Sequence, residues 1–180
     1  MPNSFTDQEE LLMSLINELV EEIRYDNAFI FNLLKEVTVS KKAILDIDDV
    51  RLELTATDED QYALQMNPVV STEIPDFKTK GDYLREIING IITLDHAISS
   101  NKILVKGTLE DLMGIYRLAI GLLIEGPVSP HLRDIWNTFN TLWHQDSTIE
   151  YVTDLNRQQV YDYFPMLSVT SDVNNVEIKF

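Results

Sequence analysis

At 180 residues and 20.7 kDa, the chain is long enough for one domain with a hydrophobic core and too short for two ordinary domains with a linker. Its 44% hydrophobic and 24% charged residues are typical of a soluble globular protein, which excludes collagen-like and wholly disordered chains. The net charge of −16 would repel phosphate backbones and anionic bilayers, so we expect no nucleic-acid partner and no stable membrane insertion.

The sequence contains no Cys, which excludes disulfide frameworks, thiolate metal sites and Cys nucleophiles. No basic stretch leads into an apolar run near the first residues, so a secretory signal is not predicted. The longest apolar stretch, residues 112–124, contains Arg117 and is well short of the roughly 20 residues that span a bilayer. We therefore expect a cytoplasmic protein.

The first 39 residues predict an N-terminal helical region. Thr6 and Glu9 have the spacing of a capping box, and apolar residues then recur at helical spacing from about residue 7 to Ile23. A second apolar group follows Asn27, so the helix either runs on through this residue or kinks there.

Apolar and polar residues alternate over residues 50–57, which predicts a half-buried strand. An acidic turn at 58–60 leads to a return strand over residues 62–66 that Pro68 interrupts, so the pattern favours a β-hairpin. A third extended segment is expected over residues 69–79.

Asp82 can cap the next helix, and Gly90 near its end is expected in the left-handed conformation. A short helix is predicted over residues 94–99. The run 103–105 is apolar on both faces between charged ends, which predicts a central strand of the sheet.

The helix that follows is the most apolar of the chain. It begins after Thr108 and ends at Gly126, and its hydrophobic circumference is wider than one sheet face can cover. We expect the helix that starts near Pro130, with Trp136 and Phe139, to cover the other side, and a ligand cavity is the alternative.

Gly114 and Gly121 lie two turns apart on the same face of this apolar helix. Without a Cβ, they allow close approach by a strand, another helix or a ligand. Helix packing is the commoner cause. For the rest of the chain we expect a strand, a helix and a final strand, at residues 148–152, 157–164 and 176–180.

Motifs for catalysis or metal binding are not found in the sequence. No two of His96, His131 and His144 lie three to five residues apart, so no local ligand pair is visible. The acidic residues at 46–49 resemble the opening of a calcium loop but lack its glycine, and an acidic turn is the better interpretation. No nucleotide-binding glycine pattern and no GxSxG occurs. We expect no enzyme, catalytic residue, metal or cofactor.

Half of the chain, from about residue 40 to residue 126, resembles the sterol carrier protein type 2 family. The similarity is in the order of elements and in local phrases, at residues 74–79, 83–90, 94–98 and 102–107. It implies an α+β fold with a mainly antiparallel, twisted sheet of about five strands and helices over one face. Residues 40–126 would form the lipid-carrier-like core of a single domain, and residues 127–180 a C-terminal helix and extension.

The resemblance also implies an apolar tunnel between the sheet and the helices, which holds fatty acyl, sterol or isoprenoid chains. The side chains that we expect to line it are Leu84, Ile87, Ile88, Ile91, Leu104, Leu109, Leu112, Met113, Tyr116, Leu118, Leu122, Trp136 and Phe139. The residues outside the family core could close the tunnel, fill it, or form a homo-oligomer interface.

The sequence therefore predicts a non-enzymatic carrier of a long apolar ligand. Burying sixteen methylenes gains about 13 kcal/mol, and about 9 remain after a binding cost of about 4, which leaves micromolar affinity or better. The alternative is a protein-interaction or accessory module of the same fold, whose cavity is filled by its own side chains.

Overall fold

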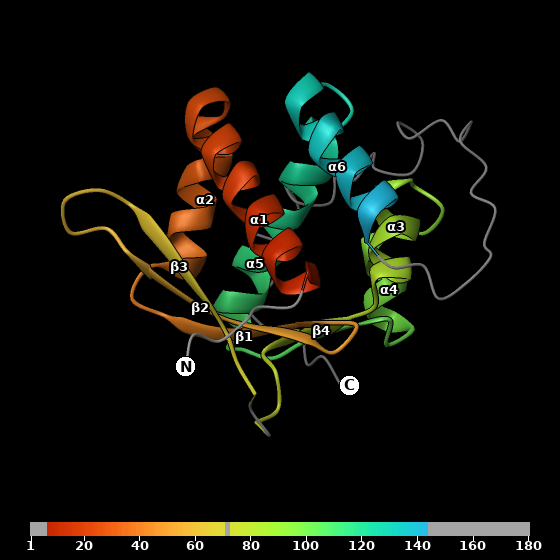
Figure 1. Cartoon of the computed structure of the whole chain (residues 1–180), viewed down its shortest axis with the longest axis horizontal. Helices are drawn as coiled ribbons and strands as arrows, with labels where there is room; N and C mark the ends of the chain where they lie inside the picture. Colours follow the sequence, from red (N-terminus) through yellow and green to blue (C-terminus); the bar gives the residue numbers. More distant parts are fainter. Residues whose placement is uncertain (1–6, 71–72, 144–180) are drawn as a thin grey trace, which may run out of the picture.

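The computed structural model describes residues 7–70 and 73–143, in which six helices lie against one face of a five-stranded sheet (Figure 1). The predicted α+β class is confirmed. The elements expected at 148–152, 157–164 and 176–180 lie outside the described residues, as do Thr6 and His144.

The N-terminal helical region consists of α1 (Asp7–Asp26) and α2 (Ala28–Thr38). The chain breaks between them at Asn27, whose side chain accepts a hydrogen bond from the backbone N of Ile30 at 3.0 Å. This N-cap satisfies a helix-end donor that has no partner within α2. The predicted helix start near residue 7 is confirmed. At Asn27 the chain is interrupted and does not run on as one helix.

The sheet is mixed, with strand order β3-β2-β1-β4-β5. β1 pairs with β4 in parallel, and the other three pairings are antiparallel. β2 and β3 form the predicted hairpin. The strands are β1 (Lys42–Ile47), β2 (Val50–Thr57), β3 (Ala63–Pro68), β4 (Phe77–Thr79) and β5 (Ile103–Val105).

The predicted position of the strand at 103–105 is wrong, because β5 lies at the edge of the sheet rather than in its centre. The central strand is β1, for which the sequence predicted no strand. Its register places Asp46 opposite Arg51 and Lys78 on neighbouring strands, and both cations approach this fully buried carboxylate, at 2.8 and 3.4 Å. A charged residue thus occupies a central strand because neighbouring strands supply its counter-ions.

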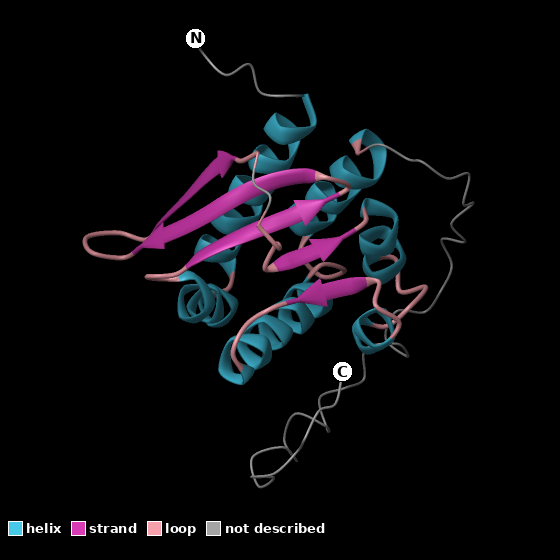
Figure 2. Cartoon of the chain, turned by 90° about the horizontal axis from the view of Figure 1, so that it is seen from below, coloured by secondary structure: helices cyan, strands magenta, loops and turns pink. Residues whose placement is uncertain are grey.

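Residues 73–76, which lead into β4, lie on the face of the sheet that points away from the helices (Figure 2). Asp76 fastens this segment to β1, because its carboxylate accepts from the backbone N of Ile44 at 2.8 Å and its own N donates to the Ile44 carbonyl at 2.9 Å. The Arg51 guanidinium donates to the carbonyl of Glu73 at 3.3 Å. Residues 73–76 therefore cover part of this face.

Two short helices, α3 (Gly81–Ile88) and α4 (Leu94–Ser99), follow β4. The predicted cap of α3 is wrong, because Lys80 is the N-cap and Asp82 lies inside the first turn, where it pairs with Arg85 at 2.7 Å. Gly90 has a φ of 71°, which confirms the left-handed conformation expected after this helix.

The last two described helices are α5 (Leu109–Glu125) and α6 (Pro130–Leu142). Thr108 and Asp111 form a reciprocal capping box at the start of α5, and Ser129 caps α6 by accepting from the backbone N of Leu132 at 3.3 Å. Among the described residues, no single helix is long and apolar enough to cross a membrane. Only α5 and α6 together reach that length and composition, and they meet at an angle of 101°.

The apolar circumference of α5 is explained by two hydrophobic clusters, one on each side of this helix. Leu118 and Leu122 pack against the larger cluster, which α1, α2, α6 and the β1–β3 strands build. Ile120 and Tyr116 belong to the smaller cluster, built with α3, α4 and β5. A helix between two clusters needs apolar residues on both sides.

The principal helical partner of α5 is α2, whereas α6 packs mainly against α1, which corrects the expectation that α6 covers α5. A Cβ on Gly114 would lie 2.6 Å from Val37 Cγ1, and one on Gly121 would lie 3.3 Å from Ile30. The two glycines therefore serve helix packing, the commoner of the causes considered for them.

Candidate functional site

The residues expected to line an apolar tunnel are divided between the two clusters and the surface. Those in or against the larger cluster are Leu84, Ile88, Leu118, Leu122, Trp136 and Phe139. Those in or against the smaller cluster are Ile87 and Tyr116. Those with exposed side chains are Ile91, Leu104, Leu109 and Met113, while Leu112 is half-buried.

Leu104 is 51% exposed because of its register. It lies opposite Lys78, so it points to the sheet face away from the helices, whereas Ile103 and Val105 point toward them. Leu104 therefore does not lie between the sheet and the helices.

An open groove lies between α1 and α6, and we call it the α1–α6 groove. It has a volume of about 340 Å³, at the small end of the roughly 300 to 1,000 Å³ typical of ligand pockets. Its lining residues are Glu18, Glu21, Glu22, Tyr25, His131, Asp134, Ile135 and Thr138.

A second open cavity, of about 310 Å³, lies between α1 and the start of β3 at the edge of the sheet. Tyr62 forms part of its wall, and burial raises the pKa of this phenol, although a hydrogen bond with the Thr38 hydroxyl at 3.0 Å opposes the shift. Arg24 donates to the Tyr62 carbonyl at 3.0 Å, so its positive charge is already engaged at this edge. Neither cavity lies beneath the helix layer where a tunnel was expected.

The lining of the α1–α6 groove combines several carboxylates with two apolar side chains. Its lining holds four carboxylates, on Glu18, Glu21, Glu22 and Asp134, and no lysine or arginine. The apolar part of the lining comes from Ile135, which is 6% exposed, and from the ring of Tyr25, which is 81% exposed. Such a groove suits a ligand that carries a positive charge on an apolar stem.

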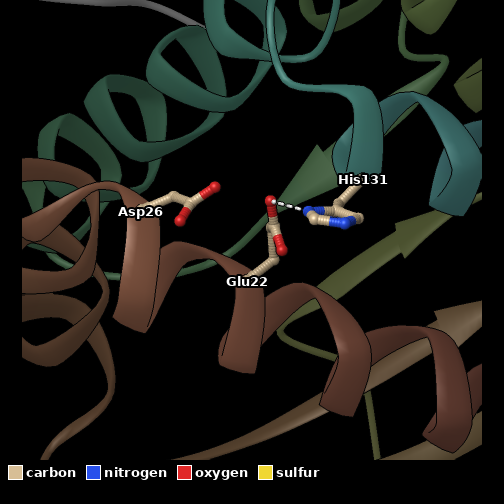
Figure 3. Close-up of side chains that lie close together, drawn as sticks. All are labelled: Glu22, Asp26 and His131. Carbon is tan, nitrogen blue, oxygen red and sulfur yellow. Dashed lines mark hydrogen bonds and ion pairs between the residues drawn. The ribbon is translucent and has the colours of Figure 1, made fainter.

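The carboxylate of Glu22 connects the two helices at one end of the groove (Figure 3). Its Oε1 accepts a hydrogen bond from the Ser129 hydroxyl at 3.0 Å and lies 3.2 Å from Nδ1 of His131. Asp26, one turn further along α1, brings a second carboxylate, and the donor atoms of Glu22, Asp26 and His131 all lie within 4.8 Å of one another. Two carboxylates and one imidazole are therefore gathered from two helices.

Sequence reasoning missed this site because its parts lie more than 100 residues apart and the pairing of α1 with α6 was not foreseen. The spacing of the three histidines among themselves shows no ligand pair. A signal was present nonetheless, since Glu18, Glu22 and Asp26 recur every four residues and so share one face of α1.

Comparison of the chain with protein-family models, with curated proteins and with solved structures finds no match. The resemblance to the sterol carrier protein type 2 family therefore stays a prediction from the sequence.

Proposed function

We propose that the protein is a non-catalytic interaction module that binds a basic, amphipathic segment of a partner protein in the α1–α6 groove. The observation that carries the proposal is the lining of this groove, in which four carboxylates stand together with Ile135 and the exposed ring of Tyr25. This is the interaction-module alternative derived from the sequence, with a definite surface and partner chemistry added.

Charge complementarity selects the occupant. A lysine or arginine of the partner can lay its aliphatic stem in the groove while its charged head reaches Glu18 or Asp134. The exposed ring of Tyr25 offers a cation–π contact to the same head. A second copy of this chain, with its net charge of −16, and its own tail from residue 144 to 180, with more acidic than basic residues, are poorer matches.

The packing of the interior supports an interaction module over a carrier. Val37 and Ile30 fill the space beside Gly114 and Gly121, and the expected tunnel residues that are buried pack into the two clusters. Lipid carriage stays a prediction, and organic extraction of the purified protein followed by lipid mass spectrometry tests it. Recovery of a long-chain lipid at one molecule per chain would favour the carrier.

The docking proposal is tested by fluorescence anisotropy with a labelled helical peptide built from lysine and leucine in a heptad pattern. A peptide with glutamate in place of each lysine is the comparison. The full chain should bind the lysine peptide and not the glutamate peptide. Charge reversal in the groove, Glu18→Lys with Asp134→Lys, should weaken binding at least tenfold, because the partner's cations then meet like charges.

The matched control is Glu59→Lys with Asp60→Lys, which makes the same change of net charge at exposed positions in the turn between β2 and β3. This variant should bind the lysine peptide within about twofold of the parent, since its substitutions lie outside the groove. If both double variants lose the same affinity, attraction comes from net charge alone, and the groove is not the docking site.

A further inference from the structure

The gathering of Glu22, Asp26 and His131 has a chemistry of its own, apart from the rest of the groove. Glu22 and Asp26 project from successive turns at the end of α1, and His131 projects from the first turn of α6 (Figure 3). The set combines two carboxylate oxygens with one imidazole nitrogen, all within 4.8 Å. It is thus a mixed donor set from two packed helices rather than a cluster of acids.

The spacing of two of the donors matches that of ligands on one metal ion. Zn²⁺ binds imidazole nitrogen and carboxylate oxygen at about 2.0 to 2.2 Å, so two tetrahedral ligands lie about 3.3 to 3.5 Å apart. Nδ1 of His131 and Oε1 of Glu22 are 3.2 Å apart. An ion can therefore replace the hydrogen bond between them with little change in either side chain.

The Glu22 side chain is held in place before any ion arrives. Only 15% of it is exposed, and the Ser129 hydroxyl that donates to its Oε1 belongs to the N-cap residue of α6. A hydrogen-bonded carboxylate of this kind resembles the oriented ligands of protein metal sites. The His131 side chain is 72% exposed, which leaves room for water and for entry of an ion.

The charges at the end of α1 also favour a cation. Glu22 and Asp26 lie near the C-terminus of this helix, where the backbone dipole is negative and acidic residues are unfavourable. The one basic residue of the last turn is Arg24, and it is engaged with Glu21 at 3.3 Å and with the Tyr62 carbonyl. A bound cation would relieve this repulsion.

We propose that Glu22, Asp26 and His131 form a binding site for a divalent transition-metal ion of the Zn²⁺ class, with water completing the coordination. The imidazole selects the class, because Mg²⁺ and Ca²⁺ prefer oxygen ligands and higher coordination numbers. Metal binding at this end of the groove does not depend on peptide docking, and a bound ion would cross-link the end of α1 to the start of α6.

The test is isothermal titration of the chelator-treated full chain with Zn²⁺ alone at pH 7, without any peptide. We expect one ion per chain with micromolar affinity, and no displacement by millimolar Mg²⁺. His131→Ala should weaken binding at least tenfold, and Glu22→Gln should do the same. The matched control is His96→Ala on α4, also an exposed histidine, which should bind Zn²⁺ like the parent.

Circular dichroism and thermal unfolding of each metal-free variant verify that the fold is kept. The imidazole NMR signals of the parent protein report metal binding without any substitution. Zn²⁺ should shift the His131 signals first. The proposal is overturned if the parent takes up no stoichiometric Zn²⁺, if His131→Ala binds as tightly as the parent, or if His96→Ala loses as much affinity as His131→Ala.

Discussion

The carboxylate of Asp48, in the turn between β1 and β2, accepts a hydrogen bond from the indole Nε1 of Trp143, which lies 95 residues later in the chain, at 2.8 Å. The same oxygen accepts from the backbone N of Gly81 at 2.9 Å, and the fully buried Arg85 donates to the Trp143 carbonyl at 2.6 Å. Sheet, α3 and the end of α6 are thus joined at one tryptophan.

Trp143→Ala should lower the free energy of unfolding by about 3 to 5 kcal/mol, because a large buried ring is removed and a cavity remains. The side chain is 2% exposed and stacks on Phe139 with ring centroids 5.6 Å apart. Urea unfolding monitored by circular dichroism measures the change. Leu142→Ala, at the exposed neighbouring position, is the control and should cost about 0.5 kcal/mol or less. Equal losses in the two variants would show that Trp143 is not anchored as described.

Gly114→Ala and Gly121→Ala should have different effects on stability, although both add a methyl group to α5. Alanine in a helix gains about 1 kcal/mol over glycine. At Gly114 the new Cβ would lie 2.6 Å from Val37, and relieving such overpacking costs about 1 to 3 kcal/mol, so we expect a net loss. At Gly121 the closest atom is 3.3 Å away, and we expect stability equal to the parent or higher. The denaturant midpoints of the two variants measure this difference. A lower midpoint for Gly121→Ala than for Gly114→Ala would contradict the packing of α2 on α5.

Asn27→Ala should lower the free energy of unfolding by about 1 kcal/mol, because the first turn of α2 loses its side-chain cap. The control is Asn32→Ala, at an exposed position within α2, where alanine is the better helix former and stability should hold or rise slightly. Thermal unfolding of both variants provides the comparison. If the Asn27 cap contributes nothing to stability, the unfolding midpoint of Asn27→Ala will not fall below that of the parent.

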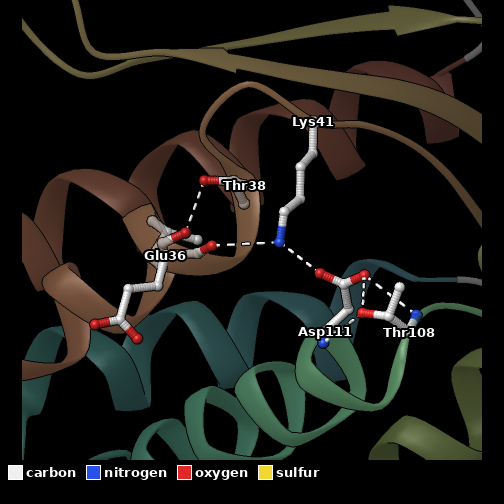
Figure 4. Close-up of polar contacts among 6 residues, drawn as sticks. Glu36, Thr38, Lys41, Thr108 and Asp111 are labelled. Atoms are coloured by element: carbon white, nitrogen blue, oxygen red, sulfur yellow. Dashed lines mark hydrogen bonds and ion pairs between the residues drawn. The ribbon is translucent and has the colours of Figure 1, made fainter.

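The Asp111 carboxyl should titrate well below the ordinary aspartate pKa of 3.8. Hydrogen bonds from Lys41 and then from Thr108 lower its pKa from 3.8 to about 2 (Figure 4). A lowered pKa in the folded state means that the carboxylate stabilises the fold above its unfolded pKa, and that this contribution is lost as the pH falls from about 4 to about 2. NMR titration of the Asp111 carboxyl measures the midpoint directly.

Substitution of Lys41 tests whether its hydrogen bond is the main cause of the lowered Asp111 pKa. In Lys41→Ala, the first contribution to the shift is removed and the Asp111 midpoint should move back toward its ordinary value. The stability difference between the parent and Asp111→Asn should be larger at pH 7 than at pH 3. A midpoint unchanged by Lys41→Ala would assign the shift to the capping box alone.

Local signals in the sequence predicted much of the fold. Asn27, Gly90 and Thr108 each act through their own backbone or through neighbours a few residues away, so the sequence shows their role directly. β1 was missed because Asp46 interrupts its apolar pattern, and the cations that neutralise this residue come from other strands.

The position of a strand within the sheet depends on pairings far along the chain. The apolar run at 103–105 indicated a buried central strand. Among the described strands, however, β5 pairs only with β4, and its register leaves Leu104 on the outer face. The candidate site was hidden for the same reason, since Glu22 and His131 meet only when α1 packs against α6. Patterns of local spacing carry no information on such contacts.

Because the interior is divided into two hydrophobic clusters, we expect one part of the molecule to unfold before the other. The β-ladder between the β1–β3 half of the sheet and the β4–β5 half has three residue pairs, from Leu45 with Phe77 to Ile47 with Thr79. The Asp76–Ile44 hydrogen bonds and the Lys78–Asp46 ion pair add to it. A short parallel ladder is a weak seam, so the smaller half with α3 and α4 should detach at a lower free energy than global unfolding requires. Amide protons of β5 should then exchange with solvent sooner than those of β2, and the contact of Trp143 with Asp48 and Gly81, which crosses this seam, sets how much sooner.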